Sequence, residues 1–136
     1  MKQEIIDKLP PDAQKEFLRL AMKLDEKTKQ ETVNKDFLSF VKHVWPQFIE
    51  GKHHKKIADK FNKIAKGEIK RLIINMPPRH TKSEFASFLL PAWMIGRKPD
   101  LKIIQTTHTT ELAVRFGRKA KTLIDSPEYQ QVFKTR

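Results

Sequence analysis

The chain has 136 residues, a formal net charge of +12 from 28 Lys and Arg against 16 Asp and Glu, and no cysteine. This length fits one domain with a modest core, and the lack of cysteine excludes disulfides, thiol nucleophiles and cysteine-ligated zinc. The charge indicates a polyanionic partner such as nucleic acid, although lysine-rich helices can also serve solubility alone. With no stretch near the roughly 20 apolar residues of a membrane span and no signal-peptide core, we expect a soluble intracellular protein.

Residues 1–34 are rich in lysine and glutamate and are predicted to form an N-terminal helical arm. Asp12 is placed to cap a helix that runs to about Lys29. The helix carries one apolar stripe at helical spacing: Phe17, Leu18, Leu20, Ala21 and Leu24. This stripe either packs on the body of the same protein or docks a partner subunit.

Two amphipathic helices are predicted next. The first begins at Asp36 and ends near Trp45, because a residue that precedes proline is pushed out of the helical conformation. The second runs from His53 to about Ala65 with lysines on its wetter side, and Gly67 is placed to stop it.

Two short apolar runs, residues 72–74 and 101–106, are predicted to be strands of a parallel sheet. Strands covered on both faces read as continuous apolar, β-branched sequence. The helix between them begins at Lys82, and Pro91 is expected to kink or end it. Strand, helix and strand in this order indicate a right-handed crossover and an α/β fold class.

Two helices are predicted in the remainder of the chain. Thr109 or Thr110 caps a helix over residues 111–124. Ser126 and Pro127 then open a short helix that extends through Phe133.

The turn after the first predicted strand has the layout of a phosphate-binding loop. Aligning the pattern G-x-x-x-x-G-K-S/T on Lys82 and Ser83 puts Met76 and Thr81 at the two glycine positions, so both glycines are missing. Backbone N–H groups at a helix start, together with the Lys82 ammonium, attract phosphate, and the Ser83 hydroxyl suits Mg²⁺. A Lys-Ser pair after such a run also arises by chance.

The stretch Ile74–Glu84, with Pro91–Trp93 and Leu101–His108, resembles the ATPase motor of large terminase subunits from tailed bacteriophages. The likeness covers roughly residues 35–134, and it departs from the family at Thr81, where glycine is commoner. It implies a P-loop NTPase-type parallel sheet flanked by helices. It also implies ATP and Mg²⁺ as cofactors, and use of ATP hydrolysis to move double-stranded phage DNA into the procapsid. Portal protein, the terminase small subunit and a homo-oligomeric ring in the host cytoplasm are implied partners and setting.

The resemblance also assigns roles to residues of the loop. Arg79, as a sensor of the γ-phosphate, and Lys82 receive catalytic roles, although Arg79 could instead pair with a neighbouring carboxylate. Ser83 would hold Mg²⁺ through the nucleotide. The expected nucleotide contacts are Pro78, Arg79, His80, Thr81, Lys82, Ser83 and Glu84.

Outside the loop, the resemblance places His53 and His54 at the adenine side. A metal site on this pair is disfavoured, because adjacent histidines diverge on a helix. Arg115 or Arg118 is a candidate arginine finger for the nucleotide of a neighbouring subunit.

A complete motor also requires an apolar strand ending in Asp-Glu, and none follows residue 108. We therefore expect residues 35–136 to be the front part of the ATPase domain, without that acidic motif and without the nuclease domain. Alone, such a fragment should bind nucleotide weakly, and its turnover is in doubt. The alternative is a basic nucleic-acid-binding helical module, or a helicase-like fragment, with a vestigial phosphate loop.

Overall fold

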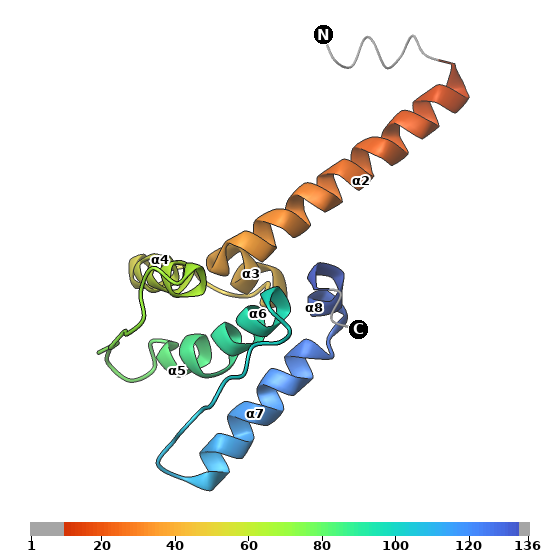
Figure 1. The fold of residues 1–136 in the computed structure, drawn as a ribbon. Coiled ribbons are helices and arrows are strands. Elements are labelled where there is room, and N and C mark those ends of the chain that lie inside the picture. Colours follow the sequence, from red (N-terminus) through yellow and green to blue (C-terminus); the bar gives the residue numbers. More distant parts are fainter. Residues whose placement is uncertain (1–9, 134–136) are drawn as a thin grey trace. The chain divides into compact units, whose positions relative to one another are not determined.

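The computed structural model describes residues 10–133. The chain divides into two compact units, Met1–Glu31 and Thr32–Arg136. In the first unit lies most of helix α2 (Pro11–Lys35), which is drawn in red to orange in Figure 1. The predicted arm helix is confirmed and is longer than expected, while residues 1–9 of the arm lie outside the described part. Four residues of its predicted apolar stripe, Phe17, Leu18, Leu20 and Leu24, are exposed, and Ala21 is partly buried.

The second unit begins with two helices that end where local sequence rules place their ends. Helix α3 (Phe37–Val44) is capped by Asp36, whose carboxylate accepts a hydrogen bond from the Ser39 N–H at 2.8 Å. Helix α4 (Lys52–Lys66) stops at Gly67, which takes the left-handed conformation with φ 82°. Both predicted helices are confirmed.

A side-chain bridge ties the start of α3 to the middle of α4. Asn62 donates from its amide nitrogen to Asp36 at 2.8 Å, and its amide oxygen accepts from the Phe37 N–H at 2.9 Å. The Ser39 hydroxyl also donates to the Asp36 carboxylate, at 2.7 Å. The bridge therefore fixes where the first residue of α3 enters the core.

The helix after the loop runs without a break through α5 (Lys82–Glu84), a π-helical turn η1 (Phe85–Leu89) and α6 (Leu90–Arg97). Pro91 has no N–H, and its ring crowds the carbonyl four residues earlier. The wider π turn just before it accommodates the ring, and the Leu90 N–H bonds to Phe85 O. Thus Pro91 distorts the helix but does not end it.

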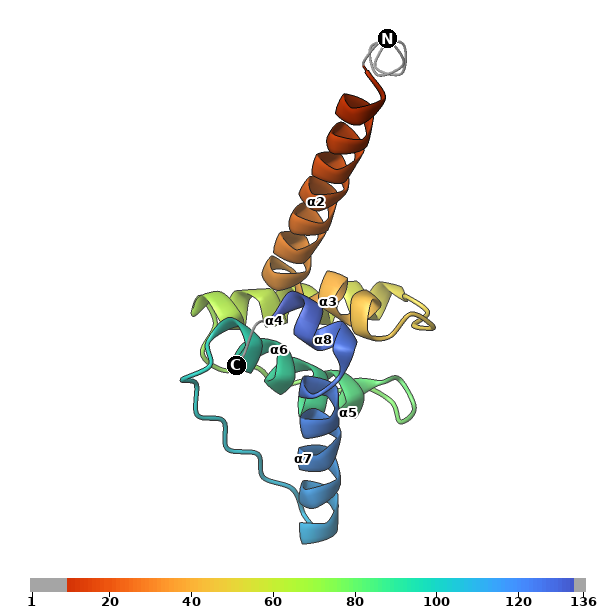
Figure 2. The ribbon, with the colours of Figure 1, turned by 90° about the vertical axis from the view of Figure 1, so that its right-hand side faces the viewer.

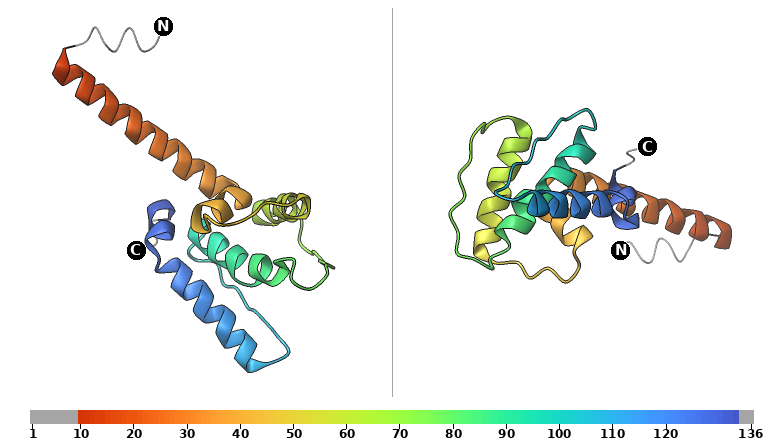
Figure 3. Two further views of the ribbon diagram at one scale, coloured as in Figure 1. Left: turned by 180° about the vertical axis from the view of Figure 1, so that it is seen from behind. Right: turned by 90° about the horizontal axis from the view of Figure 1, so that it is seen from below.

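The last two helices agree with the sequence analysis. Helix α7 (Thr110–Ile124) is capped by Thr109, whose hydroxyl accepts from the Leu112 N–H. Helix α8 (Pro127–Val132) is capped by Ser126. Figures 2 and 3 show how these helices assemble in the second unit, where α3 contacts α4, α6 and α8, and α7 packs along η1 and α6.

The predicted parallel sheet, and with it the α/β fold class, is wrong. Helices make up 69% of the structure, and none of residues 10–133 belongs to a strand. Residues 70–77 are extended, but in the described part of the chain their backbone makes no hydrogen bond to another segment. Leu72 and Ile74 pack against the helical core, whereas Ile73 between them is 86% exposed, so the run is not covered on both faces.

The segment 101–106 departs from its prediction in the same way. It is extended coil in which Ile104 is 92% exposed. β-Branched apolar residues favour an extended backbone, but a sheet also needs a neighbour to pair with. The sequence therefore predicted the local conformation and not the pairing.

The core of the second unit is a cluster of buried residues, most of the large ones aromatic, that come from α3, α4, η1, α6 and α8, with Val33 from the end of α2 and Phe133 after α8. Tyr129 of α8 donates its hydroxyl to Ala92 O at 2.7 Å, and burial raises the pKa of this phenol to about 12. A Cβ at Gly96 would lie 2.5 Å from the Phe133 ring, so α8 can approach α6 only because residue 96 is glycine. Among residues 10–133 no helix is both long and apolar enough to cross a bilayer.

Candidate functional site

The loop before α5 has an unusual backbone at two positions. Arg79 (φ 64°) and Thr81 (φ 57°) lie in the left-handed region, and they are the two non-glycine residues that do so within residues 10–133. Left-handed residues alternate here with His80 and with Lys82, where α5 begins. A left-handed residue followed by a helical one, as at Thr81 and Lys82, is the pair of conformations that turns successive N–H groups toward one side in anion-binding nests.

The loop encloses a cavity of about 450 Å³ that is lined by its own residues, 76–84. Lys82 and Ser83 are exposed. Within the described part of the chain, Arg79 and Lys82 form no ion pair. Two exposed cations and the start of α5 therefore lie at this cavity, a combination that suits a multiply charged anion.

The carboxylate that lines this cavity, that of Glu84, is paired with a residue outside the loop. Both of its oxygens accept from the Lys119 ammonium of α7, at 2.9 and 3.0 Å. Lys119 also lies over the Phe88 ring, 5.3 Å from its centre. This contact neutralises the one acidic side chain that lines the cavity and ties α7 to the start of the loop helix.

His54 lies beneath the loop and is 6% exposed. Its Nδ1 accepts from the Gly51 N–H at 2.9 Å, which leaves the ring proton on Nε2. Nε2–H then donates to the Thr81 hydroxyl at 2.7 Å, and that hydroxyl donates to His80 O at 2.7 Å. The imidazole thus spans from the start of α4 to the residue that precedes Lys82.

The hydrogen bond from His54 to Thr81 is similar in energy to the backbone strain at Thr81. A β-branched residue in the left-handed region costs on the order of 1–2 kcal/mol. One hydrogen bond contributes about 0.5–1.5 kcal/mol net. The bond from His54 is therefore large enough to offset most of the strain at Thr81.

Two further histidines flank His54. The ring of His53 is 3.8 Å from that of His54 and 5.6 Å from that of His80. His80 donates from Nδ1 to Pro78 O at 2.9 Å. His53 Nε2 is buried and has no hydrogen-bond partner in the described part of the chain. No group of three or more metal-ligating side chains occurs among residues 10–133.

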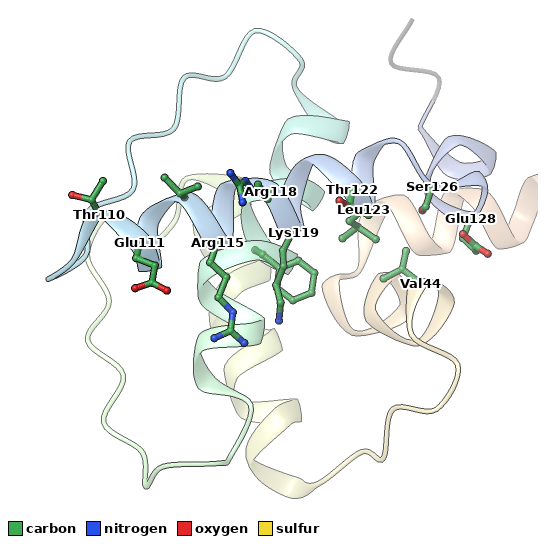
Figure 4. Close-up of a pocket in the computed structure, with 12 residues that line it drawn as sticks. Val44, Thr110, Glu111, Arg115, Arg118, Lys119, Thr122, Leu123, Ser126 and Glu128 are labelled. Atoms are coloured by element: carbon green, nitrogen blue, oxygen red, sulfur yellow. The ribbon is translucent and has the colours of Figure 1, made fainter.

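A second cavity lies along α7 (Figure 4). It has a volume of about 950 Å³, with apolar side chains from Val44, Phe88 and Leu123. Arg115 and Lys119 extend to the same side of α7 in Figure 4. Arg115 and Arg118 line this cavity and not the one at the loop, so within this chain the arginine-finger candidates are not brought to Lys82.

The structure thus gathers the predicted nucleotide-contacting residues, Pro78 to Glu84, around one cavity and adds the histidine pair next to it. The hydrogen bond between His54 and Thr81 was not predicted from the sequence. The three-residue spacing from Gly51 to His54 is that of a capping box, so it could have predicted the bond from the Gly51 N–H to the His54 ring at the start of α4. Nothing local signals the bond to Thr81, 27 positions away.

Comparison of the chain with protein-family models, curated proteins and solved structures gives no match.

The buried imidazole makes stability depend on pH. Burial and the neighbouring His53 lower the pKa of His54 from 6.5, against the opposing charge of Glu50. As the pH falls, the imidazole of His54 is therefore protonated more readily in the unfolded chain than in the folded one. Its contribution to the free energy of unfolding is complete above about pH 6.5 and is lost as the pH falls below that value. We expect the free energy of unfolding of the wild type to fall between pH 7 and 5 more steeply than that of His54→Gln. Parallel curves in urea titrations would contradict the assignment.

Proposed function

We propose that residues 76–84 bind the phosphate tail of a Mg²⁺-nucleoside triphosphate, with ATP as the expected nucleotide. The observation that carries this proposal is the loop backbone, in which two non-glycine residues hold left-handed conformations next to an exposed lysine. Strained backbone persists where the surroundings impose it, and such strain is concentrated at functional sites. Lys82 supplies the charge, and the Ser83 hydroxyl supplies an oxygen for the Mg²⁺ that accompanies the phosphates.

The other loop residues fit supporting roles in the proposal. Arg79 is exposed and forms no ion pair within residues 10–133, which favours the phosphate-contacting role over structural pairing with a carboxylate. The unpartnered His53 Nε2 supports an adenine side next to the loop, because a buried polar atom without a partner is a place for a ligand to bond.

In the cell, we propose, this loop serves a motor that moves double-stranded DNA, as the resemblance to terminase large subunits implies. The charge distribution supports a nucleic-acid partner. Residues 1–31 contain 7 basic and 7 acidic residues, so the whole net charge of +12 belongs to residues 32–136. A surface of this kind attracts a phosphate backbone in a salt-dependent way.

A titration with a non-hydrolysable ATP analogue in the presence of Mg²⁺ tests the loop. Lys82→Ala is expected to weaken binding by about 10- to 100-fold, because it removes the charge that faces the phosphates. Lys102→Ala, which removes one exposed lysine outside the cavity, is the matched control and should bind as the wild type does. Equal affinity of Lys82→Ala and wild type would overturn the proposal.

The second candidate is a nucleic-acid-binding module with a vestigial loop, and the cavity along α7 favours it. Arg115 and Arg118 line that cavity, and both are exposed. Under this alternative the double variant Arg115→Ala/Arg118→Ala weakens binding of a short DNA duplex and flattens its salt dependence. Nucleotide binding would be absent in wild type and Lys82→Ala alike.

A further inference from the structure

Residue 81 is one of the two positions at which the loop lacks a glycine of the general phosphate-binding pattern. That pattern has glycine there, directly before the lysine, because glycine takes positive φ freely. Thr81 has a Cβ and a branched side chain, yet its backbone has φ 57° and ψ 10°. Something outside residue 81 must hold it in this conformation.

The hydroxyl of Thr81 both accepts and donates a hydrogen bond. The oxygen accepts from His54 Nε2, and the proton goes to His80 O, each at 2.7 Å. With both the donor and the acceptor position used in these fixed directions, the side-chain rotamer is set. The hydroxyl thus links the strained residue to α4.

The imidazole that donates this bond cannot readily turn away. It stacks on Phe85 with ring centres 5.1 Å apart, and it makes an edge-to-face contact with Phe48 in which the ring centres are 4.8 Å apart. The Gly51 N–H holds its other nitrogen. The ring is therefore fixed in position and in tautomer before any ligand arrives.

We propose that His54 is a positioning residue for the phosphate site: through the Thr81 hydroxyl it holds residue 81 in the left-handed conformation that a glycine would supply unaided. The amide of Lys82 and the start of α5 are thereby presented to the phosphates. His54 itself touches no phosphate in this account. The inference rests on the proposed function, because it concerns how the same loop is organised to bind.

Thr81→Val is the first test, since it keeps the branched shape and removes only the hydroxyl from a partly exposed loop residue. We expect it to weaken binding of the Mg²⁺-ATP analogue about tenfold, the equivalent of one hydrogen bond. Thr81→Ser keeps the hydroxyl and should retain most of the affinity. Wild-type affinity in Thr81→Val would overturn the inference and leave the proposed function intact.

A double-mutant cycle shows whether His54 acts through Thr81. His54→Gln is expected to weaken binding in the wild-type background and to have no further effect in Thr81→Gly, where the backbone no longer needs the bond. Equal losses in both backgrounds would mean that His54 merely supports the fold, and would overturn the inference.

Nitrogen NMR of the His54 ring detects its hydrogen bond to Thr81 in the absence of nucleotide. Nε2–H should shift on Thr81→Val while Nδ1, bonded to Gly51, stays in place. If the wild type binds no nucleotide, the proposed function fails, and this shift still reports whether the bond exists. An unchanged Nε2 signal in Thr81→Val would show that the bond is not formed.

Discussion

Replacing Phe37 with alanine is expected to destabilise the second unit by about 3–5 kcal/mol, as other buried Phe-to-Ala changes do. Phe37 is fully buried, and three rings meet it edge-on: Phe61 at 5.1 Å, Phe85 at 5.4 Å and Trp93 at 5.5 Å between ring centres. These rings come from α4, η1 and α6. The truncation therefore opens a hole where three elements join, and small shifts of one element cannot close it.

Urea unfolding followed by circular dichroism measures the loss. Small domains are stable by about 5–15 kcal/mol in total, so a substantial unfolded fraction of the variant in plain buffer is within the expected range. Phe17→Ala removes the same side chain from α2, where it is 45% exposed, and should change stability by less than about 0.5 kcal/mol. If the two variants unfolded at the same urea concentration, the aromatic cluster would not be the core of the unit.

The second large effect is expected for Asp36→Ala, at about 2–3 kcal/mol. This carboxylate caps α3 and accepts from the Ser39 backbone, the Ser39 hydroxyl and the Asn62 amide. The alanine variant loses the cap and also leaves the half-buried Asn62 amide without its acceptor. Loss of a buried partner costs more than loss of an exposed bond, because the remaining group stays out of water.

The pH dependence of this effect follows from the charge of Asp36. Burial raises the pKa of Asp36, but the hydrogen bonds from Ser39 and Asn62 outweigh burial and leave it below 3.8. The stabilisation is therefore complete above about pH 4 and is lost as the pH falls through the lowered pKa. Asp25→Ala, at an exposed position of α2, is the control. A wild type and an Asp36→Ala variant of equal stability at pH 7 would contradict the prediction.

Structural features that depend on residues close together in the chain could be predicted from the sequence, and those that depend on distant residues could not. Asp36, Gly67 and Ser126 were each predicted to bound a helix, as was either Thr109 or Thr110. Asp36, Gly67, Thr109 and Ser126 do so, each through a bond to a residue within four positions. Capping depends on the nearest few residues, so a single sequence contains the information. The sheet failed because strand pairing depends on a distant partner that no pattern within residues 72–74 identifies.

The candidate site shows the same division. Lys82 and Ser83 were found from their spacing, and they lie exposed at the start of a helix as that pattern requires. Thr81 was recognised as a departure from the loop pattern, where glycine is commoner. The hydrogen bond that holds Thr81 could not be predicted, because its donor, His54, belongs to another helix and is distant in the sequence. Whether the loop binds a nucleotide stays a prediction.

The two extended segments have a consequence for the molecule in concentrated solution. Residues 70–77 carry open amide and carbonyl edges beside Ile73, and Ile104 stands nearly bare in the other segment. Unpaired backbone N–H and C=O groups next to β-branched apolar side chains can form β-type hydrogen bonds with the same segment of a second chain. At high protein concentration we therefore expect aggregation to begin at these segments. A lysine at position 73 or 104 would oppose it, because a charge disfavours pairing of such segments.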